Sequence, residues 1–461
     1  MITRRKARRV RSGVSVAEAQ QRLIETCLPL GTEYVAFVEA ADRVAAEDVM
    51  AMFPMPRFER SGVDGYAVNL SVEEGITAGK TRPCLVVTED ISAGSNFPRP
   101  LDPGTAARIM TGAEVPERAT SIVMLEETDE YTKGNRLYIQ LKHDVIPGRH
   151  IARIGEEWER GEVLIPQGRR LGGSDIGLLV AAGHRRIRVY RKPRVGIISI
   201  GNELLHPRPD AGGKMDEAMP AGMIHNSNGA MLAALVRQYG GIPYDYGIIE
   251  DDAYKARDFI RSVALKTDLV ITTGAVSVGE RDVMAEVFVR DTCLLFNKVF
   301  MRPGSPTSAG LLPLTAPGDC GDKHIESGEE GEEHRPGLLL NPHSTHRLVL
   351  GLSGNPGACF VGFELFASLC IGALQGAPFT KKDALHAFLS EPVLKGSPHP
   401  RYLQGKLRGD AGMLLAEPLP HARSSMMRSV PEATCLIVLP GGGKPALKGA
   451  LVEIIPLGGF R

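Results

Sequence analysis

Arg194-Val195-Gly196-Ile197-Ile198-Ser199-Ile200 is, after its first residue, an almost continuous apolar run. Such a run is typical of a strand buried on both faces, as in a parallel sheet that helices cover on both sides. Possible helix caps follow at residues 226–228, and an apolar stripe leads from there to Gly240-Gly241, a pair that ends a helix. The stretch therefore predicts a strand and a helix at the centre of an α/β domain.

Further strands and helices alternate along the middle third of the chain. The patterns predict strands over 246–249, 268–273, 294–301 and 347–352, and helices over 253–265 and 357–374. Elements that alternate at this spacing form a parallel, doubly wound sheet. We expect this α/β domain to span 191–380, with an insert at 313–346 whose acidic part, 319–337, is a solvated loop.

Short strands are predicted on both sides of this domain. A helix over 15–28 begins with Ser15 and Glu18 at the spacing of a capping box. The region 50–190 contains strand-sized apolar pieces separated by Pro and Gly, so it is predicted to be rich in β-structure. Beyond residue 385, a small all-β domain is predicted from strands over 401–407, 413–416, 435–439 and 451–455.

The charge balance excludes two classes of partner. Lys and Arg number 54, and so do Asp and Glu, which leaves a formal net charge of zero. A protein that coats a nucleic acid or an anionic membrane usually has a basic excess, and aromatic residues at 5% are too few for base-stacking platforms. The most apolar stretch, 348–380, is interrupted by 353–356 and by Glu364. We therefore expect no nucleic acid partner and no membrane span.

The cysteines and the first residues bear on the compartment. Seven cysteines are dispersed along the chain without a C-x-x-C pair, a pattern typical of reduced thiols. Residues 1–11 contain six basic side chains and no acidic one, but they lack the apolar core of a secretory signal. We interpret them as a basic tail, with a short transit-like segment as the alternative, and predict a cytoplasmic protein.

Loops at the carboxyl ends of predicted strands carry residues that suit an anionic ligand. In an open parallel sheet, ligands bind beyond these strand ends. Their glycines expose backbone N–H groups, their hydroxyls are further donors, and Lys298 and Arg302 would neutralise negative charge. We expect these loops to converge on one phosphate-containing ligand. They are 201–203, 250–252, 273–282, 302–306 and 353–357.

The same loops also contain carboxylates, namely Glu203, Asp251, Asp252, Glu280 and Asp282. These groups would repel a bare phosphate. Mg²⁺, however, takes oxygen ligands from one or two carboxylates together with substrate phosphates. The mixture of anion donors and carboxylates therefore predicts a divalent cation.

Other motifs leave alternatives open. Ser277 follows a predicted strand, but Ala275 stands where the nucleophile elbow of a hydrolase needs Gly, so a serine hydrolase is a weaker alternative. The run Gly441-Gly442-Gly443-Lys444 is followed by Pro445 where a phosphate-binding loop needs Ser or Thr, and we discard it as such a loop. The segments 60–66 and 108–113 are compatible with ordinary tight turns.

Six motifs follow one another in a specific order. They are Ser61-Gly62-Val63-Asp64-Gly65-Tyr66-Ala67-Val68, Arg108-Ile109-Met110-Thr111-Gly112-Ala113, Gly155-Glu156-Glu157, Gly201-Asn202-Glu203-Leu204, Thr273-Gly274-Ala275-Val276-Ser277-Val278-Gly279-Glu280 and Ser353-Gly354-Asn355-Pro356. In this order they resemble the molybdopterin molybdotransferases, the family of the MoeA-like proteins and of the E domain of gephyrin. The resemblance covers residues 15–460, and no single motif would decide it.

The resemblance implies the final step of molybdenum cofactor synthesis. In that step adenylylated molybdopterin is bound, its phosphoanhydride is hydrolysed with Mg²⁺ or another divalent cation, molybdate is inserted as co-substrate into the dithiolene, and AMP is released. A homodimer with sites in a cleft between the protomers is also implied, with other proteins of the pathway as further partners. An alternative is a scaffold on the same fold, as in gephyrin, with 319–337 as the docking segment.

An elongated α/β multidomain chain with four subdomains is implied as well. Residues 1–57 and 150–190 would form an N-terminal dimerisation subdomain, and 58–149 an inserted β-rich subdomain. The doubly wound α/β domain at 191–380 would bind molybdopterin and nucleotide, and 385–461 would form a domain resembling a β-barrel.

The site residues implied by the resemblance fall into three groups. Catalytic roles are implied for Asp64, Thr111, Glu157, Glu203, Asp282 and Lys298. Metal binding is implied for Asp64, Glu203, Asp252 and Asp282. Substrate binding is implied for Asn226, Ser227, Asp252, Gly274, Ser277, Gly279, Glu280, Arg302, Ser305, Pro306, Gly354, Asn355, Pro356, Arg401, Ser424 and Ser425.

Several positions depart from the pattern of the family. Glu157 stands where Asp is usual, Arg302 where Lys is usual, Ser305 where many members have a second Lys, Ala358 where Ser is common, and Gln404 where Arg is frequent. Loss of positive charge would weaken the binding of a small dianion, and a guanidinium is not equivalent to an ammonium. Arg423, Ser424 and Ser425 are candidate replacement donors, although taken by themselves they fit an ordinary hairpin better.

Overall fold

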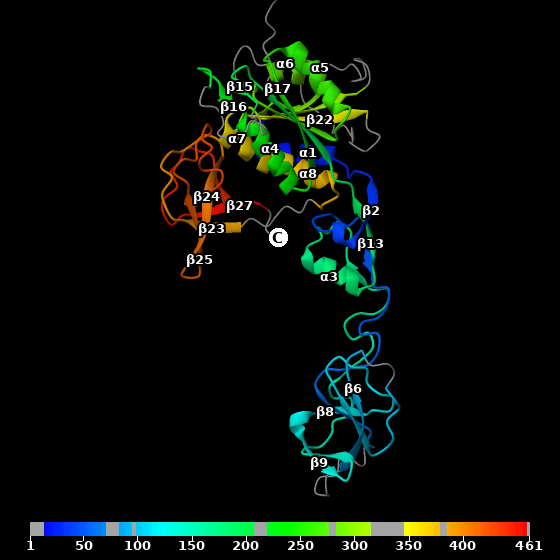
Figure 1. The fold of residues 1–461 in the computed structure, drawn as a ribbon. Helices are drawn as coiled ribbons and strands as arrows, with labels where there is room; N and C mark the ends of the chain where they lie inside the picture. The colour runs from blue at the N-terminus through cyan, green and yellow to red at the C-terminus, as the bar shows by residue number, and fades with distance from the viewer. Residues whose placement is uncertain are drawn as a thin grey trace, which may run out of the picture.

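A computed structural model describes residues 13–70, 83–94, 98–206, 219–275, 283–314, 345–378 and 385–458. The chain is elongated, with a central α/β domain, a C-terminal barrel beside it, and an arm that leads away to a separate β-module (Figure 1). The arm is formed by the N-terminal part of the chain. This multidomain α/β architecture with β-rich flanking parts confirms the predicted fold class.

The central sheet has six strands in the order β17-β14-β18-β22-β21-β19. Four of these strands run parallel to one another. They are β14 (Arg194–Ile200), β17 (Ile242–Ile249), β18 (Leu269–Thr273) and β22 (His346–Leu352).

Alternate residues of β14 enter two different hydrophobic cores. Val195 and Ile197 pack in the core that contains α4, whereas Ile198 and Ile200 pack in the core of α5 and α6. Burial on both faces explains why this strand is one apolar run and not an alternation of apolar and polar residues. The helices span Ser227–Gln238 (α4), Ala253–Ala264 (α5) and Val283–Asp291 (α6).

The prediction of one strand over 294–301 was wrong. The segment divides into β19 (Cys293–Phe296), at the edge of the central sheet, and β20 (Lys298–Val299), which pairs with β1 (Gly13–Val14). Between β19 and β22 lies β21 (Ser308–Pro313), which the pattern did not predict and which runs antiparallel to both neighbours. Apolar periodicity cannot distinguish a buried antiparallel strand from a loop when Ala, Gly and Pro make up half of it.

The helix predicted over 357–374 is present but contains a π-helical turn. α7 (Pro356–Gly362) continues through this turn, Phe363–Ala367, into α8 (Ser368–Leu374). The whole segment is long and apolar enough to cross a membrane, but 78% of it is buried within the protein, as in the core helix of a globular domain. It packs against α1 (Val16–Thr26), the helix predicted from the capping box at Ser15.

The arm begins with β2 (Thr32–Ala36), which pairs with β13 (Arg186–Tyr190), and includes α3 (Gly173–Ala181), a helix within the part predicted as β-rich. At its far end lies a six-stranded sheet in the order β8-β5-β7-β6-β10-β9. These strands span Gly65–Val68 (β5), Cys84–Ile91 (β6), Thr105–Ile109 (β7), Ser121–Met124 (β8), Thr128–Lys133 (β9) and Arg136–Leu141 (β10).

The C-terminal strands close into a barrel in the order β23-β25-β24-β26-β27. A parallel backbone bridge between Arg302 and Arg401 joins this barrel to the central domain. The amide of Arg302 donates to Pro400 O at 2.9 Å, and the amide of Tyr402 donates to Arg302 O at 2.8 Å. The strands span Leu385–Leu389 (β23), Arg401–Asp410 (β24), Met413–Pro418 (β25), Cys435–Leu439 (β26) and Leu451–Pro456 (β27).

The burial of β14 can be tested by shortening one of its buried side chains. Ile197→Ala removes most of a side chain with no exposed surface and should lower the free energy of unfolding by about 2–5 kcal/mol. Urea denaturation followed by circular dichroism measures the change. The control Val38→Ala alters a side chain that is 69% exposed and should change stability by less than about 0.5 kcal/mol. Equal, small effects of both changes would contradict this account of the sheet.

Candidate functional site

Two cavities adjoin each other at the carboxyl ends of the central strands. The larger has a volume of about 1120 Å³ and lies between the central domain and the barrel, and the smaller has a volume of about 610 Å³ and lies over the strand ends of the central sheet. Pro306, Ser353, Asn355 and Ser425 line both. The two cavities therefore share a wall.

The smaller cavity collects loops that follow all four parallel strands of the central sheet. Its lining includes Glu203 from the loop after β14, Asp251 from the loop after β17, Gly274 from the loop after β18, and residues 353–356 from the loop after β22. The start of α4 contributes Asn226, Ser227 and Asn228. The structure thus brings together, from the predicted site, Glu203, Asn226, Ser227, Gly274, Pro306, Gly354, Asn355, Pro356 and Ser425.

Asparagine side chains hold the start of α4 against the strand ends. Asn226 is the N-cap, and its Oδ1 accepts from Ser199 Oγ and from the amide of Gly229, each at 3.0 Å. Asn228 Nδ2 donates to Thr273 Oγ1 at 2.9 Å and to Gly354 O at 2.8 Å. Sequence reasoning treated Asn228 only as a possible cap, because no pattern along the chain indicates that β18, β22 and α4 meet there.

Two glycines let neighbouring strand-end loops come into contact. Gly274 has a φ of +94°, and a Cβ at this position would lie 2.1 Å from the carbonyl oxygen of Ile200. A Cβ at Gly354 would lie 3.2 Å from the Cα of Gly274. The floor of the cavity therefore requires glycine at position 274, and a side chain at position 354 would push against it.

Carboxylates lie on one side of the smaller cavity. Burial raises the pKa of Asp251, and the negative charge of Glu203 raises it further. Both residues line the cavity. Asp252 does not, because its Oδ1 accepts from the amides of Tyr254 and Lys255 at 3.0 Å and caps α5. Within the part of the chain that the structure describes, no group of three or more His, Cys, Asp or Glu residues could hold a metal ion.

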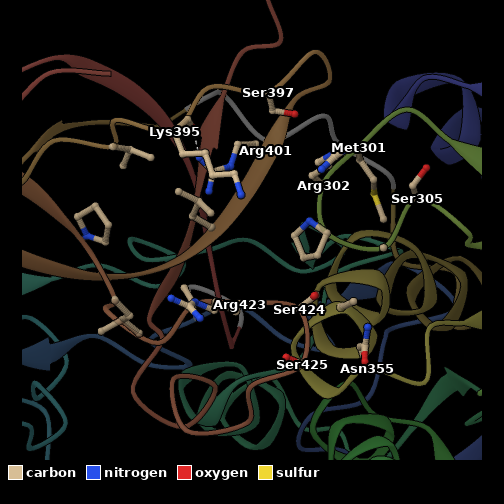
Figure 2. Close-up of a pocket in the computed structure, with 18 of the residues that line it drawn as sticks. Met301, Arg302, Ser305, Asn355, Lys395, Ser397, Arg401, Arg423, Ser424 and Ser425 are labelled. Atoms are coloured by element: carbon tan, nitrogen blue, oxygen red, sulfur yellow. Dashed lines mark hydrogen bonds between the residues drawn. The ribbon is translucent and has the colours of Figure 1, made fainter. Parts of the chain in front are cut away.

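The larger cavity is basic (Figure 2). Arg302, Arg401, Arg423 and Lys395 line it, and in the described ranges none of them forms an ion pair with a carboxylate. Burial lowers the pKa of Arg401, and the adjacent charge of Arg302 lowers it further. From the predicted site, Arg302, Ser305, Pro306, Asn355, Arg401, Ser424 and Ser425 meet here.

Comparisons with known proteins show the family of the chain. Three family models match successive parts of the chain: the MoeA N-terminal region (domain I and II) over 14–183, the probable molybdopterin binding domain over 196–373 and the MoeA C-terminal region (domain IV) over 386–457. The molybdopterin molybdenumtransferase of Bacillus subtilis (strain 168) is 32% identical over 452 residues, which cover 96% of this chain and 94% of the relative. The chain belongs to the molybdopterin molybdenumtransferase family.

Other members agree with this family assignment. The molybdopterin molybdenumtransferase of Staphylococcus epidermidis (strain ATCC 12228 / FDA PCI 1200) is 30% identical over 446 residues, with 96% of each chain covered. The crystal structure of the molybdopterin biosynthesis moea protein from Pyrococcus horikosii superposes with a TM-score of 0.73 at 26% identity, covering 97% of this chain and 100% of that one. The resemblance inferred from the motifs is confirmed, and the chain is a transferase of molybdenum cofactor biosynthesis.

Two predicted catalytic residues of this molybdenumtransferase-family chain lie in the distal β-module. Asp64 precedes β5, and its Oδ1 accepts from the amide of Thr111 at 2.7 Å and from Thr111 Oγ1 at 2.8 Å. These two hydrogen bonds lower the pKa of the exposed Asp64 carboxyl. The module is at the opposite end of the elongated chain from the cavities (Figure 1). Within one chain, the structure does not bring Asp64 and Thr111 to the other site residues.

The remaining predicted residues are scattered. Glu157 is exposed in the arm, where its amide donates to Met55 O at 2.9 Å. Lys298 lies on β20 with its Nζ 5.7 Å from the ring centroid of Phe300, and it lines neither cavity. Ser277, Gly279, Glu280 and Asp282 lie outside the described residues, as does the acidic segment 319–337.

The hydrogen bonds of Asp64 lead to a prediction about pH. Thr111→Val removes the hydroxyl donor but keeps the amide donor, so the carboxylate loses part of its stabilisation. The pKa of Asp64 should therefore rise toward its usual value, which an NMR titration of carboxyl-labelled protein would measure. Thr105→Val, a change in the same module at a hydroxyl bonded to Asp102 O, should leave the Asp64 pKa unchanged. An unaltered Asp64 pKa in Thr111→Val would show that the Thr111 hydroxyl does not stabilise the Asp64 carboxylate.

Proposed function

We propose that this chain catalyses the last step of molybdenum cofactor synthesis, in which adenylylated molybdopterin is hydrolysed, molybdate is inserted into the dithiolene and AMP is released. The observation that carries the proposal is the pair of adjoining cavities with different electrostatic character. One combines anion donors with carboxylates, and the other is lined by cations without carboxylate partners in the described ranges. A phosphoanhydride with its cation and a separate small oxyanion need these two environments.

The smaller cavity is proposed to hold the phosphoanhydride. Ser227 and the first amides of α4 are proposed anion donors, because a helix N-terminus combines N–H groups with a partial positive charge. Asn355 and the backbone of Gly354 add donors from the loop after β22. Ser277, Gly279 and Glu280, from the loop after β18, remain proposed substrate-binding residues.

Glu203 and Asp251 fit a divalent cation such as Mg²⁺. The charge of Glu203 raises the pKa of Asp251, so the two carboxylates are close enough to repel each other, and a cation between them would relieve the repulsion. When bound, the cation supplies stabilisation of the negative charge on the phosphates. Asp282 remains a proposed metal ligand, while the capping hydrogen bonds of Asp252 favour Asp251 in its place.

Molybdate is proposed to bind in the larger cavity. Arg302 and Arg401 lie side by side through their backbone bridge, and Ser305 and Ser424 add hydroxyl donors. Two adjacent guanidinium groups repel each other, and a dianion between them removes that repulsion. Because Pro306, Ser353, Asn355 and Ser425 line both cavities, an oxyanion held here would lie next to a ligand in the smaller cavity. Lys298 stays a proposed catalytic residue of the same strand end.

A homodimer is proposed to complete the site. Asp64 and Thr111 are far from the cavities within one chain, so the arm of a second protomer is the means by which they could reach the cleft. Glu157, Asp64 and Thr111 would then act across the interface. We retain 1–57 with 150–190, 58–149, 191–380 and 385–461 as subdomains, with the first of them in the dimer interface. A cytoplasmic location and contacts with other proteins of the pathway belong to the same proposal.

The reaction can be measured directly. Purified protein mixed with adenylylated molybdopterin, Mg²⁺ and molybdate should release AMP, detected by chromatography, and yield active cofactor. Glu203→Gln removes one negative charge from the proposed cation site and should slow AMP release by about 10²-fold or more. Glu432→Gln, which alters an exposed carboxylate of the barrel outside the lining of both cavities, is the matched control and should release AMP at the wild-type rate. No AMP release by the wild type would refute the proposal.

Site completion by a second protomer predicts complementation. Asp64→Ala and Arg401→Ala should each be inactive alone. After unfolding together and refolding, a mixture of the two should recover about a quarter of wild-type activity, because half of randomly formed dimers are mixed and each mixed dimer has one intact site. Activity that stays at zero although mass spectrometry detects mixed dimers would exclude a shared site.

A further inference from the structure

The basic cavity has a wall that the predicted site does not include. This wall is the segment 395–398, which precedes β24 and contributes Lys395 and Ser397 to the cavity lining. Lys395 lies beside Arg401 in Figure 2, with Arg302 and Arg423 also labelled around the cavity. Arg401 Nη1 donates to the carbonyl oxygen of Lys395, so the arginine of the predicted site also holds the backbone of the lysine.

The glycine run 441–443 holds the other side of this segment. The amides of Gly442 and Gly443 both donate to Ser397 O, at 3.0 and 2.9 Å. The two backbones touch, because a Cβ at Gly396 would lie 1.9 Å from Gly443 O. The run that superficially resembles a phosphate-binding loop is therefore a backbone clamp, and it uses its glycines to approach residues 396 and 397 closely.

The charges around the cavity do not balance. Among the described residues that line it, four side chains are cationic, namely Arg302, Lys395, Arg401 and Arg423, and one is a carboxylate, Glu391. Glu391 is 3.9 Å from Lys448, an exposed lysine outside the lining. Since like charges destabilise one another when they share a partly closed cavity, this excess favours the binding of an anion with more than one negative charge.

We propose that Lys395 is an oxyanion-binding residue of the basic cavity and raises the affinity of this cavity for a tetrahedral dianion. Arg401 and the glycine clamp 441–443 hold the backbone segment that carries Lys395. The identity of the anion as molybdate rests on the proposed function. The ammonium replaces positive charge that Ser305 does not supply, and it comes from the barrel instead of from the central domain. The barrel therefore contributes part of the affinity for the oxyanion, and the clamp fixes the position of Lys395.

Direct binding tests the proposal without the nucleotide reaction. Calorimetric titration of the full chain with molybdate should give a Kd for Lys395→Gln that is about two- to fivefold higher than for the wild type, because one partly exposed ion pair is lost. The affinity of the variant should also fall less steeply with added salt. Lys406→Gln, which removes a lysine of the same barrel outside the cavity lining, should leave the Kd unchanged.

The role of the clamp is tested by Gly396→Ala. Its Cβ forces residue 396 away from Gly443, so the Kd for molybdate should rise, while the melting temperature shows whether the barrel remains folded. If the clamp acts through the lysine, Lys395→Gln combined with Gly396→Ala should bind no more weakly than the weaker of the two single variants. If the Kd of the double variant rises by the product of the two single-variant factors, the clamp does not act through Lys395.

The outcomes separate this inference from the proposed function. An unchanged Kd in Lys395→Gln, or absence of molybdate binding by the wild type, overturns the inference. A raised Kd in Lys395→Gln with no AMP release by the wild type supports the inference and refutes the proposed reaction. In the assay of the reaction, Lys395→Gln should raise the molybdate concentration needed for half-maximal rate and leave the rate at saturating molybdate unchanged.

Discussion

Burial of the central sheet on both faces is the constraint on which the site depends. Because alternate residues of β14 enter different cores, helices must cover both faces, and the connections that leave the parallel strands all begin at the carboxyl edge of the sheet. The strand-end loops are consequently gathered at one edge of the sheet. Gly274 and Gly354 then let two of these loops touch, and Asn228 ties them to α4. The smaller cavity is a consequence of this arrangement.

The barrel adds a second cavity because it is joined to the central domain through its backbone. The hydrogen bonds on either side of Arg302 extend β24 onto the central domain, and Tyr402 and Leu436 of the barrel belong to the core of that domain. This junction places Arg401 beside Arg302 in spite of their like charges. An interface that keeps two guanidinium groups adjacent is stabilised when an anion binds there. Anion binding at this place would therefore also stabilise the contact between the barrel and the central domain.

The zero net charge of the chain conceals this separation of charge. Carboxylates accompany anion donors in one cavity, and the other is lined by cations that form no ion pair within the described part of the chain, where four residues are common to both linings. In the reaction we propose, two anionic substrates meet but need different counter-charges, and this arrangement suits them. Under the same proposal, Lys395 and Arg423 add charge from the barrel and offset the departures of this chain from the family pattern at Arg302 and Ser305.

Local sequence determined the elements whose signals are short-range. The apolar run of β14, the capping box at Ser15 and the strand-end glycines follow from backbone geometry and burial, and the ordered motifs sufficed to identify the family. Only the tertiary structure decided that β21 runs antiparallel, that Asp251 and not Asp252 lines the cavity, and that Asp64 lies far from Glu203 in one chain. It alone showed that the run 441–443 clamps residues 396 and 397, which follow Lys395. These outcomes depend on contacts between segments distant in sequence, and neither periodicity nor composition records such contacts.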